Sequence, residues 1–88
     1  MTTREGDFSF EIKNRLGVLN TYSTGWTKEL NIVQWNGGSD KFDIRDWDPA
    51  HEHMSRGVTL RSEEAKKLSD LLLKCFAEEL NDDKKENL

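Results

Sequence analysis

The residues best suited to chemistry stand in the stretch KFDIRDW, residues 41–47. Alternate side chains of an extended strand share a face, so one face carries Lys41, Asp43, Arg45 and Trp47. Unpaired bases stack on aromatic rings while cations contact the phosphates, which is how single-stranded nucleic acid is bound. We therefore predict that this face binds single strands, and that Trp47 is an exposed stacking residue.

Other residues could extend or limit this face. Lys28 and Arg56 are placed to continue the row of phosphate contacts. A carboxylate is unfavourable beside phosphate, so we expect Asp43 to pair with Arg45 or another nearby cation. The net charge of −4 also argues against many phosphate contacts. Binding should thus depend on stacking more than on charge.

The acid excess is unevenly distributed. Residues 1–61 hold 8 basic and 9 acidic side chains, whereas residues 62–88 hold 5 basic and 8 acidic ones. What governs binding is the charge of the contact face, which a total does not report.

Three tryptophans are many for a chain of this length, and each has a structural alternative. Tryptophan in a small β domain is usually core or interface filler. We expect Trp35 to pack internally, and the facing of Trp26 stays open although it is a candidate contact.

No pattern predicts an enzyme, a metal site or a cofactor. Asp48, His51, Glu52 and His53 have metal-ligand types at close spacing, but such polar loop residues are usually solvated. The sequence has no glycine-rich phosphate loop, Cys/His nucleophile pair or hydrolase elbow.

Strands must position the candidate face. Alternation predicts a first strand over residues 7–14, and further strands follow over 15–23, 26–36 and 40–47, with a short extended piece at 58–60. Phe42 and Ile44, between the charged positions, should point to the core. Apolar residues of the 26–36 strand change parity, which predicts a bulge or a strong bend there.

Residues 62–80 change to helical periodicity, with Ser62 as the predicted N-cap. The apolar side chains of this helix span roughly 240° of its circumference, far more than the stripe of about 100° that one sheet face covers. We expect one side to pack on its own sheet and the other on the same helix of a second subunit, unless a loop or the N-terminal segment covers the surplus. The predicted dimer contacts, with Cys75 as buried filler, are Leu68, Leu71, Leu72, Cys75 and Phe76.

The predicted architecture is α+β: a four-stranded antiparallel sheet followed by one C-terminal helix, in the order β-β-β-β-α. Residues 7–80 form the single domain that 88 residues allow, between a flexible N-terminus at 1–6 and a disordered tail at 81–88. The chain has one cysteine, no secretory signal and no apolar run of about 20 residues. We therefore expect a cytoplasmic protein, which could associate with a bacterial nucleoid.

Three segments in combination resemble a known family: GWTKELNIVQWNG, KFDIRDW and DPAHEHMSRGVTLRSEEAKKL. They are similar to YdbC-type proteins, small bacterial relatives of the transcriptional coactivator positive-cofactor-four family, over roughly residues 8–73. The resemblance implies a curved sheet, a homodimer and single-stranded DNA binding largely without sequence preference. It places Lys41, Arg45 and Trp47 on the DNA-contacting segment, and Arg56 at the basic end of a loop.

Two features depart from that family. Arg61 stands where a capping Thr or Asn is familiar, and the basic, serine-rich N-terminal region of eukaryotic coactivators is missing. We expect the binding module alone, acting in transcription, replication or repair. The alternatives are single-stranded RNA binding, since stacking is common to both nucleic acids, or a protein–protein module that uses the tryptophan-bearing face.

Overall fold

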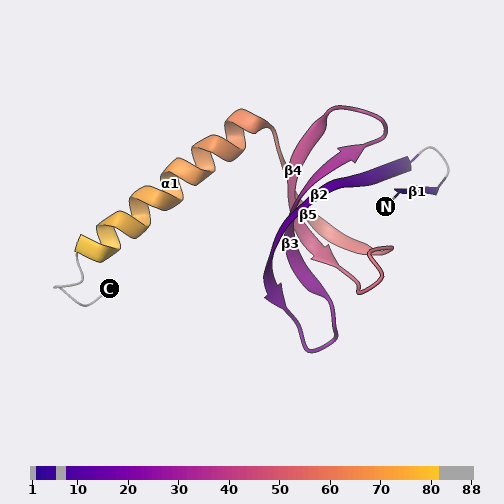
Figure 1. Cartoon of the computed structure of the whole chain (residues 1–88), viewed down its shortest axis with the longest axis horizontal. Coiled ribbons are helices and arrows are strands. Elements are labelled where there is room, and N and C mark those ends of the chain that lie inside the picture. The colour runs from indigo at the N-terminus through magenta and orange to yellow at the C-terminus, as the bar shows by residue number, and fades with distance from the viewer. Residues whose placement is uncertain (1, 6–7, 82–88) are drawn as a thin grey trace.

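The computed structural model describes residues 2–5 and 8–81, and side chains from Phe8 to Glu79. Its elements are β1 (Thr2–Glu5), β2 (Phe8–Thr21), β3 (Thr27–Trp35), β4 (Asp40–Trp47), β5 (Met54–Leu60) and α1 (Ser62–Asn81). Neighbouring strands pair antiparallel in the order β1-β2-β3-β4-β5, and α1 follows (Figure 1). The predicted open antiparallel sheet of four main strands, with one C-terminal helix, is confirmed.

The strands are divided differently from the prediction. Residues 8–21, expected to belong to two strands, form the single strand β2. The piece at 58–60 belongs to the longer strand β5. Thr2–Glu5, inside the segment expected to be flexible, pairs with β2 as β1. Most of the predicted tail, residues 82–88, lies outside the described residues.

The bulges of the β2–β3 pair lie in β2 and not in β3. The register between these strands shifts three times, so that Lys13, Leu16 and Leu19 have no partner opposite them. Residues 26–36 were predicted to contain a bulge or a strong bend, and the bulge is not found: β3 has apolar side chains on both faces, so its change of parity needs no extra residue. Three extra residues in one strand lengthen it relative to its neighbour and bend the sheet.

The bend is strong enough to bring distant parts of the sheet together. Phe10 pairs with Trp35 at one end of β3, and Trp47 pairs with Thr27 at the other end. In a flat sheet these ends lie about 26 Å apart, at a rise of about 3.3 Å per residue. The ring centroids of Phe10 and Trp47 are nevertheless only 5.3 Å apart. The sheet therefore curls around these rings.

The two faces of the sheet differ in composition. We call inner face the side that bears Phe10, Ile12, Asn31, Val33, Trp35, Asp43, Arg45 and Trp47. We call outer face the side that bears Leu30, Ile32, Phe42, Ile44, Val58 and Leu60. The buried core, Phe10, Ile12, Val33 and Trp47, lies on the inner face, with Trp35 and Met54 packed against it.

The prediction that Phe42 and Ile44 point to the core is therefore wrong, although they do share a face. Both are half-buried on the outer face. Alternation gives the two faces of a strand but not the direction in which the sheet curls, and the curl encloses the charged face.

The helix begins one residue away from its expected cap. Arg61 occupies the N-cap position, because its carbonyl oxygen accepts the first helical hydrogen bond, from the N–H of Ala65 at 2.9 Å. The Glu64 carboxylate accepts the backbone N–H of Arg61 at 2.8 Å, which is half of a capping box. Ser62, predicted as the cap, is instead the first helical residue.

The helix projects away from the sheet and does not lie across it (Figure 1). Four leucines and one phenylalanine of the helix are exposed, from 37% for Leu68 to 63% for Leu73: Leu68, Leu71, Leu72, Leu73 and Phe76. The expectation that one side of α1 packs on its own sheet is thus wrong, and Cys75, expected to be buried, is exposed in the single chain. Within the described part of the chain, no helix is long and apolar enough to cross a membrane.

Candidate nucleic-acid interface

Trp47 is completely buried, with an exposed fraction of 0%. Its ring contacts Phe10 on one side and stacks on His51, with centroids 5.7 Å apart and an interplanar angle of 25°. The prediction that Trp47 is exposed is wrong because the curl of the sheet and the loop after β4 cover the indole. In this conformation it presents no face on which a base could stack.

Arg45 is engaged inside the protein. Its guanidinium donates to both carboxylate oxygens of Asp43, at 2.6 and 2.8 Å, as the sequence led us to expect. It also donates to the carbonyl oxygen of Ser55 at 3.2 Å, and it lies 4.7 Å from the centre of the Trp35 ring. A cation over an aromatic face fixes that ring. Arg45 therefore ties β4 to β5 and positions Trp35.

A buried carboxylate holds the loop between β4 and β5. Glu29 accepts hydrogen bonds from the Thr27 hydroxyl at 2.6 Å and the Asn31 amide at 3.1 Å, and it pairs with His51 Nε2 at 2.8 Å. Burial raises the pKa of Glu29, but these three partners outweigh it and hold that pKa below its ordinary value. His51, at a left-handed φ of 59°, is thereby kept against Trp47.

Asp48 closes the same loop from its other side. Its carboxylate accepts the backbone N–H groups of His53 and Glu52, each at 2.8 Å. The hydrogen bond from His53 is the main cause that lowers the pKa of Asp48. Among the residues that the structure describes, no three His, Cys, Asp or Glu side chains gather into a metal site. The polar residues of this loop serve its own folding.

The remaining predicted cations are scattered. Lys41 is half-buried opposite Val33 on the inner face, and its charge helps to lower the pKa of Glu64, after the larger effect of the Arg61 N–H. Lys28 Nζ lies 3.9 Å from the carboxylate of Asp46, across the β3–β4 pair. Arg56 is exposed on β5 and not in a loop. The structure thus does not bring the predicted contact residues into one row.

Two accessible residues of the inner face were missed by the sequence interpretation. Phe8 is 41% exposed, and its ring centroid lies 5.9 Å from that of half-buried Trp35. Arg15, also exposed, pairs opposite Asn31 because the bulge at Lys13 changes the parity of β2. The alternation of Phe8 with Phe10 was a usable signal for the first, whereas nothing in the sequence marks the bulge.

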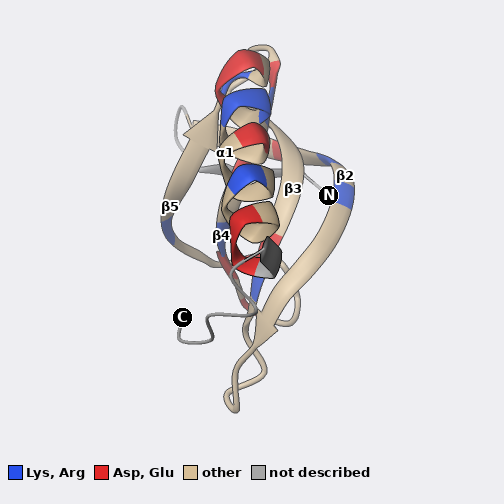
Figure 2. Ribbon diagram, turned by 90° about the vertical axis from the view of Figure 1, so that its left-hand side faces the viewer, with Lys and Arg blue, Asp and Glu red and all other residues tan. Residues whose placement is uncertain are grey.

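The accessible basic residues of the sheet lie toward its opposite sides (Figure 2). Figure 2 shows basic segments on β2 and β5, toward opposite sides, and alternating acidic and basic segments along α1. Within the described residues, neither Arg15 nor Arg56 forms an ion pair, so both are available to an anionic ligand.

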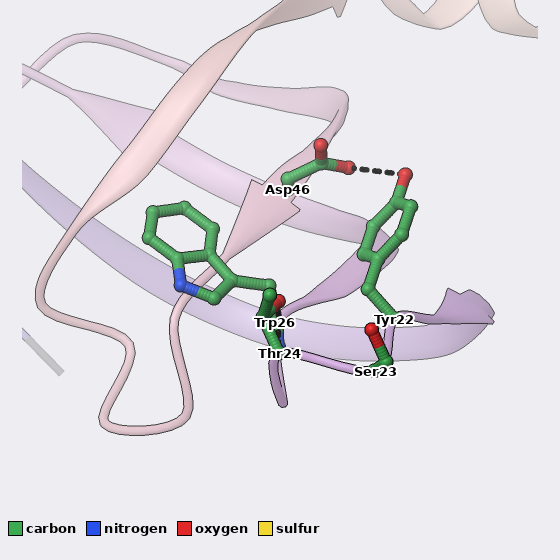
Figure 3. A pocket seen from close by; sticks show the side chains of 5 residues that line it. All are labelled: Tyr22, Ser23, Thr24, Trp26 and Asp46. Atoms are coloured by element: carbon green, nitrogen blue, oxygen red, sulfur yellow. Dashed lines mark hydrogen bonds between the residues drawn. The ribbon is translucent and has the colours of Figure 1, made fainter.

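Trp26 lines a separate pocket. It lies with Tyr22, Ser23, Thr24 and Asp46 at the turn between β2 and β3 (Figure 3). Both aromatic rings are half-buried. Asp46 alternates with inner-face Arg45 and Trp47 along β4, so this pocket is not continuous with the Phe8–Trp35 pair of the inner face.

The chain is similar in sequence to a known protein family and to a protein of known source. The family model described as Transcriptional Coactivator p15 (PC4) matches residues 22–71, which include all of β3, β4 and β5 and the first half of α1. An uncharacterized protein of Treponema pallidum (strain Nichols) is 44% identical over 66 residues, which cover 75% of this chain and 78% of that relative. The chain belongs to the PC4 family of transcriptional coactivator p15.

Proposed function

We propose that this protein binds single-stranded DNA, without requiring a defined sequence, as a homodimer. The observation that carries the proposal is the family match, because it spans the three strands that form most of the curled sheet. Single-strand binding is the property that the family suggests. Transcription, replication and repair all expose such strands, and each is a setting in which this activity would serve.

The accessible part of the inner face supplies a stacking platform. Phe8 and Trp35 lie side by side at one end of the sheet, and Arg45 fixes Trp35 from the protein side. Bases stack on such rings irrespective of their identity. Arg15 and Lys41 on the same face are placed for phosphates, and Arg56 stands at the β5 edge. In this arrangement Arg45 and Trp47 support the platform and do not touch the ligand.

The homodimer is supported by what a single chain leaves uncovered. A groove of about 670 Å³ runs between the outer face and α1 as far as Phe76, lined by apolar side chains that include Leu30, Phe42, Leu60, Leu68 and Leu72. Exposed apolar surface on this scale is costly in water and marks an interface. A second copy of α1 has the apolar stripe that fits this groove.

Oligonucleotide titration tests the binding. Adding a short oligo-thymidine to the full chain should quench tryptophan fluorescence, and binding should weaken when the salt concentration is raised. Phe8→Ala should cost about 1–3 kcal/mol of binding free energy if one base stacks there. Arg15→Gln should reduce the salt dependence, whereas Lys66→Gln on the helix should not. Absence of binding at low salt would refute the proposal.

The same titration distinguishes the alternatives. Equal affinity for oligo-uridine would mean that the protein does not distinguish RNA from DNA, because only the 2′-hydroxyl and the thymine methyl group differ. If neither oligonucleotide binds, the tryptophan-bearing face is better explained as a protein–protein contact.

A further inference from the structure

The pocket at the β2–β3 turn combines two aromatic rings with one carboxylate. Tyr22 and Trp26 stand on either side of a cavity of about 510 Å³, with Asp46 between them and Ser23 and Thr24 along the turn (Figure 3). It is separate from the Phe8–Trp35 platform described above. Its side chains are those that could hold a flat, polar ring.

The turn that carries the rings is held by its own hydrogen bonds. The N–H of Tyr22 donates to the carbonyl oxygen of Trp26 at 2.8 Å, and the N–H of Gly25 donates to that of Tyr22 at 2.9 Å. Gly25 has a φ of 94°, and a Cβ there would stand 3.3 Å from Pro49 Cγ. The turn therefore packs on the β4–β5 loop, and the pocket is present before any ligand arrives.

The two oxygens of the Asp46 carboxylate differ in the hydrogen bonds that they accept. Its Oδ1 accepts the Tyr22 hydroxyl at 3.2 Å and lies 3.9 Å from Lys28 Nζ. Its Oδ2 accepts no hydrogen bond from the residues that the structure describes, and the side chain is 29% exposed. An ionised carboxylate can only accept hydrogen bonds. A ligand ring must therefore present N–H donors to it.

Among the nucleobases, guanine fits this demand best. Its Watson–Crick edge presents two adjacent donors, the ring N–H and the exocyclic amino group. Thymine presents one donor between two carbonyl oxygens, which a carboxylate would repel. Unstacked bases in single strands are commonly recognised through this edge while they stack on aromatic side chains.

Lys28 favours a nucleotide over a free cation. An aromatic pair beside a carboxylate could also hold an ammonium or guanidinium group. However, Lys28 already compensates the charge of Asp46, and it would repel a second cation. Its side chain is 44% exposed and could contact the phosphate of the same nucleotide.

We propose that the pocket formed by Tyr22, Trp26 and Asp46 is a base-binding subsite that prefers guanine within a bound single strand. The inference rests on the proposed single-strand function. It adds to a sequence-tolerant platform one position at which the identity of the base is read.

The test compares oligo-thymidines that carry one central guanine, inosine or thymine. The full chain should bind the guanine oligonucleotide about tenfold more tightly than the thymine one. Inosine, which lacks the amino group, should fall between them. Asp46→Asn should remove the preference, whereas Tyr22→Phe, which keeps the ring and the acceptor, should retain it.

The outcomes separate this inference from the proposed function. Equal affinity for the three oligonucleotides, or a guanine preference that survives Asp46→Asn, overturns the subsite while single-strand binding stands. Quenching by guanosine monophosphate without any oligonucleotide binding would refute the proposed function and keep the pocket. Quenching by free arginine but not by guanosine monophosphate would make the pocket a cation site and overturn the inference.

Discussion

The inner and outer faces belong to the same strands, yet a single chain completes only one of them. On the inner face Phe10, Val33 and Trp47 are almost fully excluded from water, and buried Asp43 and Glu29 have partners. On the outer face Val58 is 53% exposed, and the adjoining helix exposes its leucines. Curl therefore encloses one face without any second layer, while the other stays partly exposed in the single chain.

This difference changes the roles of charged and apolar residues. The inner face, which looks polar in the sequence, contains the core, and its charged side chains form hydrogen bonds within the protein. The face that looks apolar remains open to association. Even the inner face is not fully satisfied, since Asn31 Oδ1, Trp35 Nε1 and Trp47 Nε1 are buried without hydrogen-bond partners among the residues that the structure describes.

The largest effect should come from breaking the inner core. Trp47→Ala should lower the free energy of unfolding by about 3–5 kcal/mol, because it removes a fully buried aromatic ring and leaves a cavity. Urea denaturation measures this loss. Trp26→Ala, which removes a half-buried indole at the turn, should cost less than half as much. A stable Trp47→Ala protein that loses only DNA binding would contradict the assignment of Trp47 to the core.

The second effect tests whether the outer face is an interface. Leu72→Gln should weaken self-association by about 2 kcal/mol or more, because a leucine that lines the groove loses its apolar contacts. Sedimentation equilibrium measures the change in the dimer dissociation constant. Lys74→Gln, a substitution on the charged side of the same helix, is the control. A wild-type chain that is monomeric at micromolar concentration would refute the dimer.

The sequence pattern predicted β3, β4 and the helix, but not the undivided β2, the strand β1 or the direction in which the sheet curls; a curved sheet was expected from the family resemblance alone. Alternation and helical periodicity report which side chains share a face, so the β4 pattern and the apolar helix were read correctly. The three bulges in β2 come from pairing between strands, and residues such as Lys13 and Leu16 carry no local mark of it. The direction of bending, and with it the buried face, was therefore beyond a strand-by-strand interpretation.

The sequence predicted which types of residue form the candidate site, but only partly where they lie and whether they are exposed. Pairing of Asp43 with Arg45 followed from charge and spacing. Burial of Trp47 did not, because it depends on Phe10, which is far away in the sequence, and on His51 at a left-handed φ. The turn pocket was missed because Tyr22, Trp26 and Asp46 become neighbours only when β3 pairs with β4.

A smaller effect tests how closely β5 packs on β4. A Cβ at Gly57 would overlap Arg45 Cβ and the carbonyl oxygen of Ile44. Gly57→Ala should therefore lower the free energy of unfolding by about 1–3 kcal/mol. The overlap would push β5 away from Arg45, whose guanidinium binds the Ser55 carbonyl oxygen of β5. Gly17→Ala is the matched control, because a Cβ there would meet no atom of the described residues within 4 Å, apart from Gly17 itself and its two chain neighbours. Equal urea midpoints for the two variants would show that β5 is not constrained here.

The smallest effect concerns the Glu29–His51 pair that keeps the loop over Trp47. Glu29→Gln preserves the volume but removes the charge from three hydrogen bonds, and it should cost about 1 kcal/mol near neutral pH. Because the pKa of Glu29 is lowered in the folded protein, its stabilising contribution is complete above the unfolded pKa of about 4.3. It is lost as the pH falls through the lower folded value.

The stability difference between the wild type and Glu29→Gln should therefore shrink below about pH 4. Urea midpoints at a series of pH values measure this difference, with Glu11→Gln on half-exposed β2 as the control. Opening of the loop without global unfolding would expose the Trp47 indole, and its fluorescence would then become quenchable by iodide in Glu29→Gln alone. A difference that stays constant down to acid pH would mean that the charge of Glu29 does not hold the loop, and that burial of the inner face depends on the curl alone.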